Sequence, residues 1–320
     1  MKRIAYLLVP EFQVMVFGGL TVFEVANHTA KQPFYDIHLI SESGGPVRSS
    51  LGYSVTSEAF GDVPFDTVIV AGALSISPVS VGVVEFLRRA TTSSRRMASM
   101  CTGTFYLAQA GLLDQRRVTT HWFFARQLQS NYPTLTVDED RIFIVDGQIW
   151  TSAGMTAGID LALAMVEQDL GAEVARSVAK KLVVFHRRSG GQLQHSALLE
   201  LDAKSDRIQN ALLYAKNHLH TPLTVDQLAD VANLSPRQFS RAFRSETGQS
   251  PAKAVENLRV EAARSMMEEG RTPIDVVARE TGFADRNRMR RAFLRAFGQP
   301  PQAMRRSLRN GITASHGTIK

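Results

Sequence analysis

The chain has 320 residues, enough for two domains that each bury a hydrophobic core. Hydrophobic residues make up 44% of the chain and charged residues 21%, a composition that is typical of globular proteins and excludes disordered and fibrous ones. The single cysteine, Cys101, excludes an internal disulfide framework and a cysteine-cluster metal site. The sequence contains no run of about 18 apolar residues, so we expect no membrane span and a cytoplasmic location. We also expect no metal and no cofactor.

The positive charge is concentrated at one end of the chain. The net charge is +7, but residues 204–320 contain 20 Lys and Arg against 11 Asp and Glu, whereas residues 1–203 contain 17 against 19. The whole positive excess therefore falls in the C-terminal third. Such an asymmetry predicts that this part of the chain faces a polyanion.

In the first two-thirds of the chain, short apolar runs alternate with helical patterns. The predicted strands are Ile4–Val9, Tyr35–Ser41, Thr67–Ala71 and Met97–Met100. The predicted helices between them include Leu20–Ala30 and Val81–Thr91. Because parallel strands need such crossover connections, the alternation predicts βαβ units and a flavodoxin-like α/β sandwich, in which helices cover both faces of a parallel sheet.

The pattern changes towards the C-terminus. Asp146-Gly147 lies between two short apolar runs and predicts a two-residue hairpin. Two helical patterns follow, over residues 157–170 and 172–184, and from about residue 205 the pattern is helical without a strand signal. We therefore predict an α/β domain followed by an all-α domain. The expected boundaries are an α/β domain over 1–187, a linker over 188–205, a helical domain over 206–309 and a flexible tail over 310–320.

The helical region contains an internal repeat with an offset of 50 residues. Its first copy has Arg241-Ala242-Phe243, Gly248-Gln249 and Pro251. Its second copy has Arg291-Ala292-Phe293, Gly298-Gln299 and Pro301. Each copy predicts a short helix, a turn and a longer helix, which is the arrangement of a helix-turn-helix motif.

Capping residues support this division into helices. In the first copy, Thr224 is placed to cap the short helix, and Ser235-Pro236 opens the longer one. In the second copy, Thr272-Pro273 opens the short helix, Gly282 ends it and Asp285 caps the longer helix. The longer helix of each copy is the one expected to project into a major groove of DNA.

The longer helix of the second copy has an unusual set of outward-facing residues. They are Arg286, Asn287, Arg288, Arg290 and Arg291. Four arginines in six residues repel one another unless an anion faces them, and the arginine side chain matches the edge of guanine. The alternative is a charged face that is merely solvated. The repeat, the caps and the absence of interleaved acids favour DNA binding.

Residues 206–309 resemble the DNA-binding unit of the AraC/XylS family of bacterial regulators, which consists of two tandem helix-turn-helix motifs. The matching residues are Gly282–Asn287, Phe293, Phe297-Gly298 and Pro300-Pro301. Met304 stands where the family often has an aromatic residue. The resemblance implies that both recognition helices enter successive major grooves on one face of double-stranded DNA. It also implies base or phosphate contacts from Arg237, Ser240, Arg241, Arg286, Arg288 and Arg291.

Cys101 follows the apolar run Met97–Met100 and precedes the helical pattern Thr102–Ala110. This place predicts a sharp strand-to-helix turn of the nucleophile-elbow kind. A helix N-terminus lowers the pKa of a thiol, so the position is compatible with a reactive cysteine. The alternative is a small, buried and inert cysteine.

The α/β region is similar to the PfpI and class I glutamine amidotransferase-like fold over about residues 3–185. The similarity lies in Cys101-Thr102-Gly103, Leu107-Ala108, Ala110–Leu113, Thr119–Trp122, Thr151–Gly154 and Thr156–Asp160. Isonitrile hydratases share these motifs, as do the AraC-family regulators of the GlxA type, which join this domain to the tandem helix-turn-helix unit. The whole chain resembles a GlxA-type regulator.

An enzyme of this fold needs a group beside the thiol that moves protons. Protease-like members place a histidine directly after the cysteine, where this chain has Thr102, and hydratase-like members place an acid where the alignment puts Val16. Glu11 and Glu24 lie near that position in the sequence but do not occupy it, and His121 is equally compatible with a structural role. These departures predict that the chain is not an enzyme and that its cysteine is a vestigial nucleophile.

The resemblance instead implies a sensor domain. Parallel α/β sheets bind small molecules at the carboxyl ends of their strands. The expected ligand-binding residues are Phe12, Gly72, Ala73, Cys101, Thr102, Ser152, Ala153, Gly154 and Thr156. Backbone N–H groups at the predicted helix starts suit a carboxylate. The resemblance suggests a nitrogen-containing metabolite, such as an amino acid or a quaternary amine.

The sequence therefore predicts a sequence-specific DNA-binding transcription regulator that a small-molecule effector controls, and an activator of a catabolic operon. We expect a homodimer through the α/β domain and RNA polymerase as a further partner. Two alternatives stay open. One is a cysteine-dependent hydratase or amidohydrolase-like enzyme with a fused DNA-binding domain. The other is a redox switch at Cys101, for which a lone thiol without a resolving partner is a poor candidate.

Overall fold

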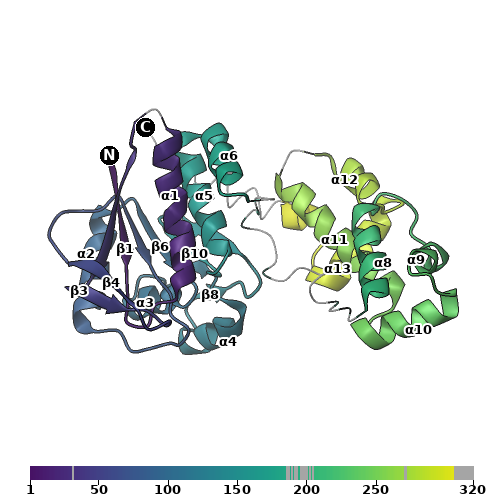
Figure 1. Ribbon diagram of the computed structural model, residues 1–320, viewed down its shortest axis with the longest axis horizontal. Helices are drawn as coiled ribbons and strands as arrows, with labels where there is room; N and C mark the ends of the chain where they lie inside the picture. The colour runs from purple at the N-terminus through teal and green to yellow at the C-terminus, as the bar shows by residue number, and fades with distance from the viewer. Residues whose placement is uncertain are drawn as a thin grey trace. The chain divides into compact units, whose positions relative to one another are not determined.

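The computed structural model describes residues 1–30, 32–184, 188, 190, 194, 201, 203, 205–269 and 272–305 (Figure 1). The chain divides into two compact units, residues 1–194 and residues 195–320. The predicted tail 310–320 and most of the predicted linker 188–205 lie outside the described residues. Within the described ranges, no helix is both long enough and apolar enough to cross a membrane.

A mixed sheet forms the centre of the first unit, with the strand order β3-β4-β2-β1-β5-β6-β10-β9. Its strands are β1 (Lys2–Leu7), β2 (Tyr35–Ser41), β3 (Ser43–Arg48), β4 (Ser54–Ala59), β5 (Thr67–Val70), β6 (Arg96–Met100), β9 (Phe143–Asp146) and β10 (Ile149–Ser152). All neighbours pair in parallel except β3 and β9, which are antiparallel at the two edges. The central order β2-β1-β5-β6-β10 is that of the predicted flavodoxin-like sheet.

The register of the central strands aligns their carboxyl ends. Leu7 pairs with Val70, Val70 with Ser99, and Met100 with Ser152. The loops that follow β1, β5, β6 and β10 therefore leave the sheet side by side. This edge is where a ligand site is expected in an α/β sheet.

Two groups of helices cover the sheet, one on each face (Figure 1). One group consists of α1 (Phe17–Thr29), α5 (Ala157–Leu170) and α6 (Ala172–Lys181), which pack against one another. The other includes α2 (Val81–Ser93), which packs against α3 (Gly103–Gln109). Since β5 and β6 are covered on both faces, every residue of these two strands is buried. This burial explains why both strands are mainly apolar and lack the alternation of apolar and polar residues that a half-exposed strand has.

The predicted hairpin at Asp146-Gly147 is present between β9 and β10, with Gly147 at a φ of 60°. The β3–β4 hairpin was not predicted, because its only buried residues are Val47 and Ser57. An edge hairpin with so few inward side chains lacks the apolar alternation by which strands are found. The sequence reading also left out α4 (Trp122–Asn131) and the two-stranded sheet of β7 (Arg117–Val118) and β8 (Thr136–Val137).

The second unit is helical throughout its described part. Its helices are α8 (Asp206–Asn217), α9 (Val225–Val231), α10 (Pro236–Thr247), α11 (Pro251–Glu269), α12 (Ile274–Glu280) and α13 (Arg286–Phe297). They form two hydrophobic clusters, one around Phe239 and Phe243 and one around Met289 and Phe293. Helix α11 contributes Ala254, Val255 and Leu258 to the first cluster and Val260, Ala263 and Met267 to the second. The unit therefore consists of two subdomains that α11 joins.

The predicted caps are present at three of the four helix starts. Thr224 and Ser235 each form a full capping box, with Gln227 and Gln238 respectively, and the Asp285 carboxylate accepts a hydrogen bond from the N–H of Arg288. At α12 the N-cap is Pro273 and not Thr272, and no side chain caps this helix. Pairs of short and long helices thus occur twice, as the repeat predicted.

Candidate functional site

Helix α13 presents the arginine-rich face that the sequence predicted. Its apolar residues Met289, Ala292 and Phe293 are buried in the second subdomain and hold one side of the helix against the protein. The opposite side is exposed. The predicted residues on that side are Arg286, Asn287, Arg288, Arg290 and Arg291, and all five are exposed.

Two arginines of α13 have acidic partners, although no acid is interleaved among them in the sequence. Arg286 forms an ion pair with Asp275 of α12, and the Arg288 Nε lies 3.8 Å from the carboxylate of Asp285. Asp275 belongs to α12, and Asp285 is the residue that caps α13, so both acids lie outside the arginine-rich run itself. Arg290 and Arg291 have no ion pair among the described residues.

Helix α10 has the equivalent arrangement in the first subdomain. Phe239 and Phe243 are buried, whereas Arg237 and Arg241 are exposed and Ser240 is partly exposed. The αL residue Gly248 ends α10, and Gly298 ends α13 in the same way. The two predicted recognition helices thus match each other in length, caps and buried face.

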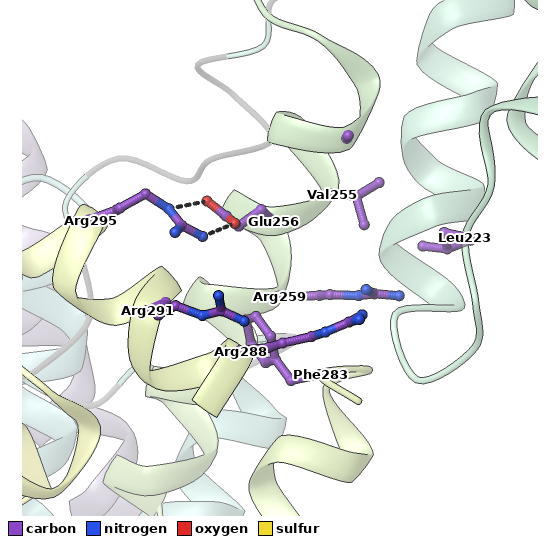
Figure 2. A pocket seen from close by; sticks show the side chains of 9 residues that line it. Leu223, Val255, Glu256, Arg259, Phe283, Arg288, Arg291 and Arg295 are labelled. Atoms are coloured by element: carbon purple, nitrogen blue, oxygen red, sulfur yellow. Dashed lines mark hydrogen bonds and ion pairs between the residues drawn. The ribbon is translucent and has the colours of Figure 1, made fainter. Parts of the chain in front are cut away.

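A cavity of about 380 Å³ lies between α13, α11 and the segment before α9 (Figure 2). It is lined by Leu223, Ala252, Val255, Glu256, Arg259, Phe283, Arg288, Arg291 and Arg295. Arg288 and Arg291 were predicted as DNA contacts, whereas Arg259 and Arg295 were not. Arg259 stands in α11, between the two helix-turn-helix motifs, and was not among the residues that the sequence analysis singled out.

In the first unit, Cys101 occupies the elbow that the sequence predicted. Its φ of 54° lies in the left-handed region, between the end of β6 and the start of α3. Two glycines make room for it. A Cβ at Gly154 would lie 2.3 Å from the Cys101 Cβ, and one at Gly72 would lie 2.8 Å from it. No side chain fits at either glycine while the elbow keeps this shape.

The structure brings the predicted ligand-binding residues together around this elbow. Ala73 exchanges two hydrogen bonds of 2.8 Å with the hydroxyl of Thr102, and the N–H of Cys101 donates to the carbonyl of Ser152 at 3.0 Å. Phe12 forms an isolated bridge with Ala73. Phe12, Ala73, Cys101, Thr102, Ser152, Ala153 and Gly154 are all buried. Thr156, at the start of α5, is exposed.

The surroundings of the thiol favour the inert alternative. Burial raises the pKa of Cys101 to about 11, and the backbone hydrogen bond of Thr102 only partly offsets this effect. The expectation of a lowered pKa at the helix start is therefore wrong, because burial removes the solvation that a thiolate needs. Val16 is buried, Glu11 is exposed and pairs with Arg48, and Glu24 is exposed on α1. His121 caps α4 by accepting a hydrogen bond from the N–H of Phe123.

Arg188 and Gln194, near the end of the first unit, contact residues that surround the Cys101 elbow. Arg188 pairs with the buried Asp160 at 2.7 Å and donates to the hydroxyl of Thr156 at 2.8 Å. The side-chain amide of Gln194 donates to the carbonyls of Thr120 and Arg141, at 2.8 and 3.0 Å, and accepts from a backbone N–H of α4. The hydroxyl of Thr120 in turn donates to the carbonyl of Cys101 at 2.7 Å.

Comparison with known proteins connects both units to one family. The model of the DJ-1/PfpI family matches residues 17–168, and a helix-turn-helix domain model matches residues 228–307. The transcriptional regulator CdhR of Pseudomonas aeruginosa is 31% identical over 92% of this chain and 89% of its own length. The regulator GlxA of Rhizobium meliloti is 30% identical over 95% of this chain and 96% of its own.

The chain belongs to the family of HTH-type transcriptional regulators that these two proteins represent. It is a DNA-binding regulator of the GlxA type, with a DJ-1/PfpI domain and an AraC-type helix-turn-helix domain. An AraC family regulator from Pseudomonas putida supports the fold of the first unit, with a TM-score of 0.52 at 19% identity over 57% of this chain and 100% of its own. The relatives favour the regulator over the fused enzyme.

Proposed function

We propose that this regulator reads DNA with α10 and α13 and responds to a small molecule at the Cys101 elbow. The observation that supports DNA reading is that α10 and α13 have the same geometry. Each is anchored by buried apolar residues and exposes basic residues on the other side. The proposed DNA contacts are Arg237, Ser240, Arg241, Arg286, Asn287, Arg288, Arg290 and Arg291.

Replacing Arg291 with alanine should lower the affinity of the full chain for its promoter DNA about tenfold, because the variant loses one contact to a base or a phosphate. Fluorescence anisotropy with a promoter fragment and a random duplex measures this loss. Arg279→Ala is the matched control, since Arg279 is exposed on α12 beside Glu280 and lies outside both recognition helices. Equal losses in the two variants, or no preference of the unmodified chain for promoter DNA, would contradict the proposal.

The second half of the proposal concerns the effector. The predicted ligand residues converge at one edge of the sheet, and the exposed Thr156 lies at the N-terminus of α5, where backbone N–H groups suit a carboxylate. We propose a nitrogen-containing metabolite with an anionic group as the ligand. Arg188 already contacts Thr156, so a ligand at this helix start would disturb a contact near the end of the unit.

A thermal-shift screen of the full chain against amino acids and quaternary amines tests the effector proposal. A ligand at 100 times its Kd should stabilise the protein by about 2.7 kcal/mol. We propose that the hydroxyl of Thr156 contacts the ligand together with the backbone N–H groups at the start of α5, so Thr156→Val should reduce this shift. Thr29→Val, at the far end of α1, is the control and should respond as the unmodified chain does. If Thr156→Val shows a thermal shift as large as that of the unmodified chain, the ligand does not bind at Thr156 and the effector proposal is contradicted.

We further propose that the protein acts in the cytoplasm as a homodimer formed through the first unit, and that it activates a catabolic operon by contacting RNA polymerase. A dimer would place two DNA-binding units on adjacent sites. Light scattering of the purified chain, with and without promoter DNA, reports the oligomeric state. Transcription in vitro with purified polymerase reports the direction of regulation.

A further inference from the structure

The cavity between α11 and α13 contains an unusual excess of positive charge. Four of its lining residues are arginines, Arg259, Arg288, Arg291 and Arg295, against one acid, Glu256. Figure 2 shows Arg288 and Arg291 extending from α13 towards the space that Arg259 also borders. Guanidinium groups that share a concave space repel one another unless an anion lies between them.

Arg259 is the least exposed of the four arginines that line the cavity. It is partly buried and donates to the carbonyls of Leu219 and Thr221, at 3.2 and 2.7 Å. Burial lowers the pKa of its guanidinium, which means that the charge is poorly solvated where it stands. Because both of its described partners are neutral carbonyls, its charge is not compensated by them.

Glu256 partly fills the role of an anion in this cavity. Its carboxylate accepts hydrogen bonds from Arg295 of α13 (Figure 2). It also accepts one from Lys253 of α11, at 3.0 Å. Burial by itself would raise the pKa of Glu256, but these hydrogen bonds outweigh burial and lower it. Glu256 is therefore ionised at neutral pH and keeps Arg295 engaged within the protein.

The position of the arginines on α13 distinguishes two faces of this helix. Arg288, Arg291 and Arg295 are spaced by three and four residues and share the cavity side. Arg286 and Arg290 do not line the cavity, and Arg286 is paired with Asp275. A helix that lies in a major groove has a phosphate backbone beside it, and phosphates receive most arginine contacts that fix the position of a protein on DNA.

We propose that this cavity binds a phosphate group of the DNA backbone, held by Arg288 and Arg291 with Arg259 at its inner end, and that Glu256 weakens this binding by retaining Arg295. The proposal rests on the proposed placement of α13 in a major groove. It assigns Arg288 and Arg291 to phosphate positioning and leaves base recognition to the other face of the helix. It also adds two residues, Arg259 and Glu256, that lie outside the helix-turn-helix motifs.

Glu256→Gln tests the proposal in the full chain. The variant should bind both promoter and random DNA several-fold more tightly, because Arg295 becomes available to the phosphate. The slope of log affinity against log salt should become steeper by about one unit. Glu280→Gln is the matched control: it removes the same charge from an exposed pair on α12, outside the cavity, and should leave both quantities unchanged. Unchanged or weaker binding by Glu256→Gln would overturn the proposal.

A second pair of variants keeps the test decisive if Glu256→Gln folds poorly. Arg295→Ala should weaken DNA binding, because it leaves the Glu256 carboxylate in the cavity without its partner. Arg295→Ala combined with Glu256→Gln should recover most of that loss. If the double variant binds DNA as weakly as Arg295→Ala, Glu256 does not oppose a phosphate and the proposal fails. Selective binding of promoter DNA by the unmodified chain is measured in the same series and tests the DNA-reading function separately.

A free phosphorylated molecule has the same chemistry as a backbone phosphate, and pyrophosphate distinguishes the two. At constant ionic strength and without DNA, pyrophosphate should leave the Tm of the full chain nearly unchanged, since Glu256 retains Arg295 and the contacts that the rest of the duplex makes with the protein are missing. A rise in Tm that Arg291→Ala abolishes would assign the cavity to a free phosphate compound and overturn the assignment to DNA.

Discussion

Replacing Gly282 with alanine should unfold or misplace the second helix-turn-helix subdomain. Gly282 has a φ of 75°, and a Cβ there would lie 1.8 Å from the carbonyl oxygen of Leu219 and 2.8 Å from the Nε of Arg259. A backbone carbonyl cannot move aside without shifting its segment. We expect a loss of about 3 kcal/mol or more in the free energy of unfolding, together with loss of DNA binding. Urea denaturation and anisotropy measure the two effects.

Gly298→Ala separates the clash from the backbone strain. Gly298 has a similar φ of 66° at the end of α13, but a Cβ there would meet no atom within 4 Å. This variant should lose only the cost of a left-handed residue, about 1 kcal/mol, and should retain DNA binding. If both glycine variants lose the same stability, the contact between Gly282 and the first subdomain is not what holds the two subdomains in place.

Asp169→Asn should strongly destabilise the first unit. The Asp169 carboxylate is 3% exposed and accepts hydrogen bonds from Arg96, at 2.7 and 2.8 Å, and from Arg95 at 2.7 Å. The side chain of Arg96 is also only 3% exposed, so removal of its partner leaves a buried charge without compensation. Breaking a buried pair from one side costs about 3–5 kcal/mol, which urea denaturation should detect.

Asp138→Asn is the control for this prediction. Asp138 also pairs with an arginine, Arg117, but the side chain of Arg117 is 43% exposed and that of Asp138 is 32% exposed, and pairs so open to solvent contribute at most about 1 kcal/mol. A comparable loss in the two variants would contradict the role assigned to burial.

The pairing of Asp169 with Arg95 and Arg96 also predicts that the stability of the first unit depends on pH. Burial would raise the pKa of Asp169, but the two arginines outweigh it and lower it, so its stabilisation is present above pH 4 and is lost as the pH falls further.

The architecture of both units could be predicted from the sequence. The central strands are mainly apolar because helices cover both faces of the sheet, and such apolar-rich runs are visible without any knowledge of the fold. Helix starts in the second unit were marked by Thr224, Ser235 and Asp285, whose side chains accept hydrogen bonds from backbone N–H groups three residues away. The β3–β4 hairpin escaped prediction because an edge strand needs few buried side chains.

The two candidate sites also contain features that a single element determines and features that depend on contacts between distant segments. The exposed face of α13 and the elbow at Cys101 follow from spacing along a single element, and both were predicted from the sequence. The burial that raises the pKa of the Cys101 thiol depends on the loops around Gly72 and Gly154, which meet it only in the folded sheet. For the same reason a local rule on helix ends predicted the wrong direction for this pKa.

The amino-acid order alone thus established two kinds of domain, two recognition helices and an elbow, because periodicity, caps and turns act over a few neighbouring residues. Folding decided which charges face one another. Glu256 and Arg295 are 39 residues apart and Arg259 contacts a carbonyl 40 residues before it. Their cavity exists because α11 packs against α13 and the segment before α9, and such long-range packing leaves no local pattern in the sequence.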